Sequence, residues 1–319
     1  MHTQRFLCTA GLFLTLAVAP AFSQSSQPKP KLTAPRPGLT EENIVYGEAA
    51  GEKLTMDYYR AAGPGPHPIA IIIHGGGFVG GTSKNISEAY CADFLVPAGY
   101  AVFSINYRLA PKYPYPAMVD DVLTSVRFLH DNAGKWNADP KRIALVGGSA
   151  GGYLSNMAGL RSVDTDAQVQ AVVTLYGVSD FSGRPVNERV QALLGPLIKE
   201  KGEEVALREA SPITYVAAKA PPFLLIHGDK DEAVLFEQST RLQEAMRKAG
   251  ASCDLIRIAD GAHATGRWHT LPNAVDWEQQ MVVWLNKTLH HDGPIGAGIR
   301  ERKKIQERSK NQEQSQNNR

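Results

Sequence analysis

The chain has 319 residues, of which 43% are hydrophobic and 21% are charged, so it is long enough to bury the core of one large α/β domain or of two small ones. The formal net charge of +2 is unevenly spread. Residues 1–23 contain a single arginine, and residues 292–319 contain seven lysines and arginines against four acidic residues. The segment between them therefore carries a small negative charge, which argues against nucleic acid as a partner.

The first 23 residues have the pattern of a signal peptide. Arg5 supplies the positive charge, residues 6–19 form an apolar stretch, and residues 21–23 offer the small side chains of a cleavage site. The stretch is too short to span a bilayer comfortably. We therefore expect an exported protein, secreted or periplasmic, without stable membrane insertion; the alternative is a buried N-terminal helix.

Composition divides the rest of the chain into three parts. Residues 24–40 are polar and rich in proline, which predicts a linker. Residues 292–319 lack aromatic residues and are rich in Gln, Asn, Lys and Arg, which predicts a disordered basic tail. One folded domain is expected over residues 41–291. Within it, residues 181–216 are longer than a plain crossover needs and contain a helical pattern, so they are a candidate cap or lid insertion.

Apolar runs typical of strands alternate with helical patterns along the folded domain. This alternation predicts an α/β fold with a mostly parallel central sheet and helices on both faces, and continuous apolar runs are expected for strands covered on both sides. The predicted strands are 53–59, 69–73, 101–105, 143–146, 171–175, 223–226 and 254–258. The predicted helices lie near 84–96, 117–132, 150–160, 236–249 and 273–290.

A serine stands at the junction between one of these strands and the next helix. The apolar run 143–146 continues directly into Gly147-Gly148-Ser149-Ala150-Gly151. Glycines on both sides allow a tight turn with the serine in a strained conformation at its apex, beside the first amides of the helix. Ser149 is therefore a candidate nucleophile, although a plain glycine-rich turn gives the same short pattern.

A glycine-rich loop follows the predicted strand 69–73. It reads His74-Gly75-Gly76-Gly77-Phe78, and such a loop leaves backbone N–H groups available to converge on one point. Preorganised N–H donors stabilise the negative charge that develops when a carbonyl is attacked. We expect Gly76, Gly77 and Ala150 to supply an oxyanion hole; the alternative is a flexible or phosphate-binding loop. His74 is expected to hold the loop rather than to take part in catalysis.

An acid and a histidine follow two later strands, as a serine nucleophile requires. His227-Gly228-Asp229-Lys230-Asp231 ends the strand 223–226, and Asp231 is preferred because Asp229 is typical of a turn residue. His263 follows the strand 254–258 between small residues, on a loop that can bring its ring to the serine. The order Ser149, Asp231, His263 is the chain order of α/β-hydrolases.

At this point the chain resembles the α/β-hydrolase superfamily, in the esterase and lipase group that includes hormone-sensitive-lipase-like and BD-FAE-like carboxylesterases. The resemblance covers roughly residues 41–290. It implies the α/β-hydrolase fold, with Ser149 as nucleophile, His263 as general base and Asp231 as the acid that orients it. It rests on the segments 74–78, 107–111 (Tyr-Arg-Leu-Ala-Pro), 116–117, 120–121, 147–151, 210–212 (Ala-Ser-Pro) and 227–231, together with His263.

The resemblance also implies details around the site. In such proteins the Tyr-Arg-Leu-Ala-Pro stretch is structural, with Arg108 paired to an acid such as Asp120 or Asp121. Hormone-sensitive-lipase-like members usually carry Asp where this chain has Gly148, and an Asp-Pro-Leu-type motif where it has residues 227–231. Both departures favour the BD-FAE-like side, which includes acetyl-xylan and feruloyl esterases.

These features predict a secreted serine carboxylesterase. The expected substrates are small-molecule or carbohydrate-linked esters, with short acyl, acetyl or feruloyl groups, and the sequence leaves the oligomeric state open. Two alternatives are amide or peptide hydrolysis by the same triad, as in a formamidase or prolyl peptidase, and an inactive binding module. Candidate pocket-lining residues are Phe78, Tyr153 and Trp268.

No cofactor or metal is expected from this mechanism. Cys91 and Cys253 remain after removal of a signal peptide, and neither lies in a metal-ligand spacing. Whether the two cysteines form a disulfide is left open.

Overall fold

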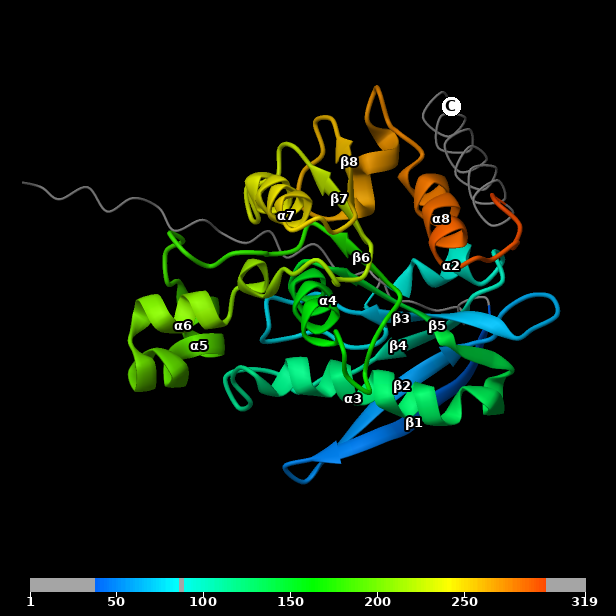
Figure 1. Cartoon of the computed structure of the whole chain (residues 1–319), viewed down its shortest axis with the longest axis horizontal. Coiled ribbons are helices and arrows are strands. Elements are labelled where there is room, and N and C mark those ends of the chain that lie inside the picture. Colours follow the sequence, from blue (N-terminus) through cyan, green and yellow to red (C-terminus); the bar gives the residue numbers. More distant parts are fainter. Residues whose placement is uncertain (1–37, 86–88, 297–319) are drawn as a thin grey trace, which may run out of the picture. The chain divides into compact units, whose positions relative to one another are not determined.

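The computed structural model describes residues 38–85 and 89–296 (Figure 1). The predicted signal peptide, 1–23, lies outside the described residues, as do most of the predicted linker and residues 297–319 of the predicted tail. None of the described helices is both long enough and apolar enough to cross a bilayer.

A sheet of eight strands forms the centre of the described residues, in the order β1-β2-β4-β3-β5-β6-β7-β8. Strand β2 is antiparallel to both of its neighbours, β1 and β4, whereas every neighbouring pair from β4 to β8 is parallel. The prediction of a mostly parallel sheet is confirmed. The strands are β1 (Leu39–Ala49), β2 (Glu52–Tyr59), β3 (His67–Ile73), β4 (Ala101–Ile105), β5 (Ala138–Gly148), β6 (Ala171–Leu175), β7 (Phe223–Gly228) and β8 (Cys253–Ile258).

Helices cover both faces of this sheet, because alternate side chains of each buried strand point to opposite sides. In β3, Ile69, Ile71 and Ile73 join the core that contains α3, α4 and α7, whereas Ala70 and Ile72 join the core that contains α2 and α8. The helices are α2 (Ala92–Leu95), α3 (Ala117–Asn132), α4 (Ala150–Arg161), α5 (Glu188–Lys201), α6 (Glu203–Glu209), α7 (Glu237–Lys248) and α8 (Trp277–Thr288), and the 3₁₀ turns are η1 (Ala133–Trp136), η2 (Pro212–Tyr215) and η3 (Thr265–Thr270).

The structure differs from the sequence prediction near the N-terminal end of the domain. β1 was not predicted, and it begins at Leu39, so the predicted linker 24–40 is too long by its last residues. Of the helix predicted at 84–96, residues 86–88 lie outside the described residues, and α2 (Ala92–Leu95) lies within the predicted range. At the start of the predicted range, the Asn85 amide donates to the Thr82 carbonyl and the Asn85 side chain accepts from the Thr82 amide, which forms a turn.

The segment 181–216 lies between β6 and β7 and contains α5, α6 and η2 (Figure 1). Its role as a cap stays a prediction. At the other end of the domain, the His291 ring contacts the Ala98 carbonyl at 2.9 Å, and the Asn286 amide donates to the Gly293 carbonyl at 2.9 Å. The first residues of the predicted tail 292–319 therefore still pack against the domain.

Candidate active site

Ser149 occupies the tight turn between β5 and α4. Its backbone has φ +56° and ψ −118°, a conformation that non-glycine residues rarely adopt and that is typical of functional sites. The flanking glycines are required by close packing. A β-carbon on Gly151 would lie 2.0 Å from the Ile73 carbonyl oxygen, and one on Gly147 would lie 2.2 Å from the Gly151 carbonyl oxygen.

Three side chains that are far apart in the sequence meet at this turn. The Ser149 Oγ lies 3.0 Å from His263 Nε2, and His263 Nδ1 lies 2.7 Å from Asp231 Oδ2. With the proton on Nδ1 donated to the carboxylate, Nε2 is left to accept the proton of the serine hydroxyl. The structure thus brings together the three residues that the sequence predicted for the triad.

Asp231 is buried and held by several donors at once. Its Oδ1 accepts hydrogen bonds from the Ala233 and Val234 amides, each at 2.9 Å. Burial raises the pKa of this carboxyl, but hydrogen bonds from His227, His263 and the Val234 amide outweigh it and hold the pKa well below its usual range. Asp231 therefore stays ionised at any pH at which the protein is expected to work.

His227 is a site residue that the sequence analysis missed. Its ring is fully buried, with Nε2 2.8 Å from the Val234 carbonyl and 3.3 Å from Asp231 Oδ2, and Nδ1 2.7 Å from Ser239 Oγ. The Val234 carbonyl can only accept, so Nε2 carries the proton and also points it toward the acid. The sequence did place His227 directly after the predicted strand 223–226, and this position could have indicated a role in the site.

The competing acid, Asp229, has a different role. Its Oδ2 accepts from the Arg257 guanidinium at 2.5 and 2.8 Å, and its Oδ1 accepts from the Asp260 amide at 2.8 Å. These bonds hold Asp229, which follows β7, against Arg257 at the end of β8 and against the loop that follows that strand. Asp229 is thus occupied in loop structure and does not contact His263.

Aromatic side chains support the loop that carries His263. Trp268 Nε1 donates to the Ala262 carbonyl at 2.9 Å, and the Trp268 ring packs edge-on against Tyr176. Tyr176 in turn lies 4.8 Å from the His263 ring, centroid to centroid. The histidine loop is therefore anchored at Ala262, immediately before His263, and the His263 ring itself packs against Tyr176.

The amides expected to form the oxyanion hole are available to a ligand. Gly76 and Gly77 have φ values of +128° and +62°, in the region that favours glycine, and Ala150 is the first residue of α4. Within the described part of the chain, none of these three N–H groups donates a hydrogen bond. Free N–H groups at a helix start and a glycine loop are the arrangement that binds an anion or an oxyanion.

The His74 side chain packs against the glycine loop and against Tyr107. It is buried, its Nδ1 donates to the Gly75 carbonyl at 2.7 Å, and its ring stacks on Tyr107 at 4.2 Å. Tyr107 also donates to the His74 carbonyl at 2.7 Å. Burial lowers the pKa of His74 to about 4, so the ring is neutral at ordinary pH and serves as packing for the loop.

The side chains predicted to line a pocket, those of Phe78, Tyr153 and Trp268, are all buried. Phe78, Tyr153 and Phe181 pack against one another in the core on the α4 side of the sheet, and Phe78 is 5% exposed. Trp268 is 1% exposed and lies in the core on the opposite side. A pocket role for Phe78, Tyr153 and Trp268 stays a prediction.

A family model described as BD-FAE matches residues 56–246, more than half of the chain. The chain belongs to the BD-FAE family. The matched stretch includes the glycine loop, Ser149 and Asp231, and it ends before His263. This membership confirms the resemblance to α/β-hydrolase esterases that the motifs indicated.

Relatives of this BD-FAE family member are named as esterases. It is 32% identical over 248 residues to Esterase LipC of Mycobacterium tuberculosis (strain ATCC 25618 / H37Rv), covering 70% of this chain and 61% of LipC. It is 29% identical over 280 residues to Esterase LipQ of the same organism, covering 82% of this chain and 59% of LipQ. The chain thus spans about three fifths of the length of these relatives.

Among solved structures, the chain is similar to a truncated form of carbohydrate esterase from gut microbiota. The TM-score is 0.68 at 25% identity, and the match covers 80% of this chain and 99% of the other. The likeness confirms the α/β-hydrolase fold.

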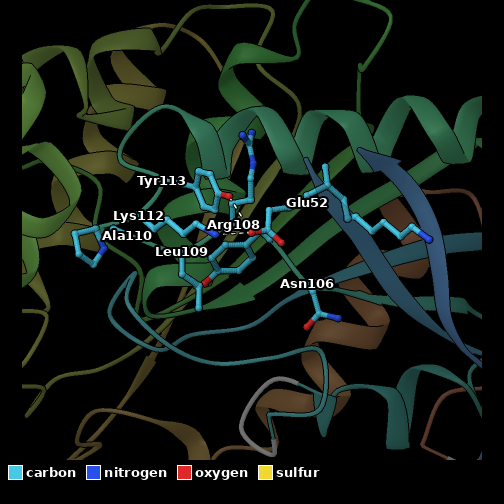
Figure 2. Close-up of a pocket in the computed structure, with 11 residues that line it drawn as sticks. Glu52, Asn106, Arg108, Leu109, Ala110, Lys112 and Tyr113 are labelled. Carbon is cyan, nitrogen blue, oxygen red and sulfur yellow. Dashed lines mark hydrogen bonds and ion pairs between the residues drawn. The ribbon is translucent and has the colours of Figure 1, made fainter. Parts of the chain in front are cut away.

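A cavity of about 580 Å³ lies between residues 52–54 of β2 and the loop 106–113 (Figure 2). None of the triad residues lines it, and three of its charged side chains, Glu52, Arg108 and Lys112, are in ion pairs. Arg108 Nη2 bonds Asp121 at 2.7 Å, so Asp121 rather than Asp120 is the partner of this arginine, and Lys112 Nζ bonds Glu52 at 2.6 Å.

The described residues also bear on metal binding and on the two cysteines. Among them, no group of three or more His, Cys, Asp or Glu side chains has the arrangement to hold a metal ion. Cys91 is buried and Cys253 is half-buried, and the two are not joined by a disulfide.

Proposed function

We propose that this protein is a serine carboxylesterase that acts through an acyl-enzyme. The observation that carries the proposal is the continuous set of hydrogen bonds from Ser149 Oγ through the His263 ring to Asp231. Membership of the BD-FAE family and the similarity to LipC support an ester as the substrate.

Each group has a defined part in the reaction. His263 Nε2 takes the proton of Ser149 as Oγ attacks the ester carbonyl, and the charge of Asp231 stabilises the imidazolium that forms. The protonated histidine then gives its proton to the leaving alkoxide, which leaves an acyl group on Ser149. Water deprotonated by His263 attacks this acyl group, and the acid product departs as the serine regains its proton.

The amides of Gly76, Gly77 and Ala150 would bind the oxyanion of both tetrahedral intermediates. Their N–H groups are fixed by the loop and the helix start before the reaction begins. Such preorganised donors need no rearrangement when charge develops on the carbonyl oxygen. In studied enzymes, one such donor contributes about 3–4 kcal/mol to transition-state stability.

The proposed substrates are esters of short acyl groups, free or linked to polysaccharide, and the protein is proposed to be exported. The sequence pattern of residues 1–23 supports export. The structural neighbour named as a carbohydrate esterase supports a sugar-linked ester.

The proposal is tested with 4-nitrophenyl acetate and its amide analogue, 4-nitroacetanilide. S149A is expected to lower kcat for the ester at least about a thousandfold, because it removes the nucleophile. S252A, at an exposed serine far along the chain, is the matched control and should keep its activity. Ester hydrolysis that persists in S149A, or faster hydrolysis of the amide than of the ester, would overturn the proposal.

A further inference from the structure

Arg189, at the start of α5, covers part of the glycine loop. A β-carbon built on Gly77 would lie 2.9 Å from Arg189 Cδ and 3.0 Å from its Nε and Nη1. The rest of the side chain is exposed. A guanidinium therefore stands next to a residue whose amide is a candidate oxyanion donor.

Arg184, which like Arg189 lies in the segment 181–216, contacts the loop that carries Asp231. Its Nη2 donates to the Ala233 carbonyl at 3.3 Å, and the Ala233 amide donates to Asp231 at 2.9 Å. The side chain is half-buried. This burial lowers the pKa of Arg184, and the charges of Asp231 and Asp180 oppose the shift without forming a contact pair.

Neither guanidinium has a carboxylate partner within 4 Å among the residues that the structure describes. The two acids nearest to Arg184 are already occupied. Asp231 is bound by the Ala233 and Val234 amides, His227 and His263, and Asp180 is bound by Arg241 and the Ser182 amide. A half-buried arginine without a counterion is uncommon, because desolvation of the charge is left without compensation.

The order of the strands places the two arginines on either side of the serine. Gly77 follows β3 and Ala233 follows β7, whereas Ser149 follows β5, which lies between β3 and β7 in the sheet. The residues from Arg184 to Arg189 thus reach from the acid loop to the glycine loop. Arg189 is thus close to a candidate oxyanion donor, Gly77, and Arg184 is close to the loop that carries Asp231.

We propose that Arg184 and Arg189 bind a carboxylate that the ester substrate carries next to its scissile bond. The inference rests on the proposed esterase function and names the substrate class of the same site. A guanidinium presents its donors in a planar fork that matches a carboxylate, and two charges in a partly desolvated site favour such a group over a neutral one. The carboxylate can belong to the acyl part, as in a dicarboxylic half-ester, or to the alcohol part, as in an acetylated uronic acid.

Two matched substrate pairs distinguish these sources. Monomethyl succinate and methyl butyrate differ in a carboxylate on the acyl side, and 4-acetoxybenzoate and phenyl acetate differ in one on the alcohol side. Acid release is followed in a pH-stat. In at least one pair, kcat/KM for the charged ester is expected to exceed that for the neutral one roughly ten- to hundredfold, the range of charge-assisted hydrogen bonds. This ratio should fall as salt is raised, because the charges are partly exposed to solvent.

The variants R189Q and R184Q should each lower that ratio by about fivefold or more. R208Q is the control, since Arg208 lies in α6 of the same segment and pairs with Glu204 on the surface, and it should leave the ratio unchanged. A ratio of one or less in both pairs, or an equal loss on charged and neutral esters in R189Q, would overturn the proposal. Failure of the esterase assignment would be separate, as a lack of Ser149-dependent hydrolysis of phenyl acetate.

Discussion

Two carboxylates on one loop, Asp229 and Asp231, are separated by a single residue and yet have different partners. Asp231 is buried, with His263 and two backbone amides on its oxygens. Asp229 bonds Arg257 and the Asp260 amide. Only the first can orient the histidine ring and stabilise its charge.

This difference predicts that two conservative substitutions will have very different effects on kcat. D231N should lower kcat for 4-nitrophenyl acetate about ten-thousandfold, as expected when the acid no longer fixes the histidine tautomer. D229N keeps the His263 contacts intact and should retain activity within a few-fold. Steady-state kinetics on the two purified variants, with circular dichroism to verify folding, measures the contrast. Equal losses in both variants would contradict the assignment of the acid.

The junction of β5 and α4 shows how closely neighbouring elements approach at the serine turn. A side chain on Gly151 has no room, because the backbone of β3 lies where its β-carbon would be. The obstacle is a strand carbonyl in the middle of the sheet, which cannot move away as a flexible side chain could.

Because the site has no room for a side chain, G151A is expected to lower the free energy of unfolding by about 3 kcal/mol or more. G134A is the matched control, since nothing lies within 4 Å of a β-carbon there and the φ of Gly134 is not positive. It should change stability by less than about 0.5 kcal/mol. Urea unfolding of both variants gives the two values, and a stable G151A would show that the turn is looser than described.

Elements with continuous apolar runs could be predicted from the sequence, and others could not. The predicted strands 101–105 and 171–175 match β4 and β6 residue for residue, because buried parallel strands need apolar side chains on both faces. β1 was missed since it is an edge strand with mostly polar, exposed side chains, and such a strand depends on pairing with β2 rather than on its own pattern.

The candidate active site could likewise be predicted only in part. The triad could be predicted because each residue follows its own strand, and the fold collects the carboxyl ends of parallel strands at one edge. His227, Arg184 and Arg189 could not be assigned, because their contacts depend on how loops from different strands approach one another in space.

The stability of the whole molecule should depend on pH through buried His74. Burial lowers its pKa to about 4 in the folded protein, against 6.5 for an unperturbed histidine. Between these values the unfolded chain binds a proton that the folded protein does not, so stability is complete above pH 6.5 and is lost as the pH falls toward 4. Asp231, with its lowered pKa, adds a loss in the same direction at lower pH, below 3.8.

The expected loss from His74 between pH 7 and 4.5 is about 2 kcal/mol. Urea unfolding of the wild-type protein and of H74Q at both pH values measures it. The wild type should lose about 2 kcal/mol more than H74Q over this interval. The same pH dependence in both proteins would contradict the assignment of a neutral, buried His74.

The proposed mechanism requires that the Oγ of Ser149 takes up the acyl group. A fluorophosphonate inhibitor forms a stable covalent bond with an activated serine, and intact-mass measurement followed by peptide mapping locates it. We expect one adduct per chain, on Ser149, with loss of esterase activity in proportion to labelling. Labelling of another residue, or full activity in completely labelled protein, would contradict it.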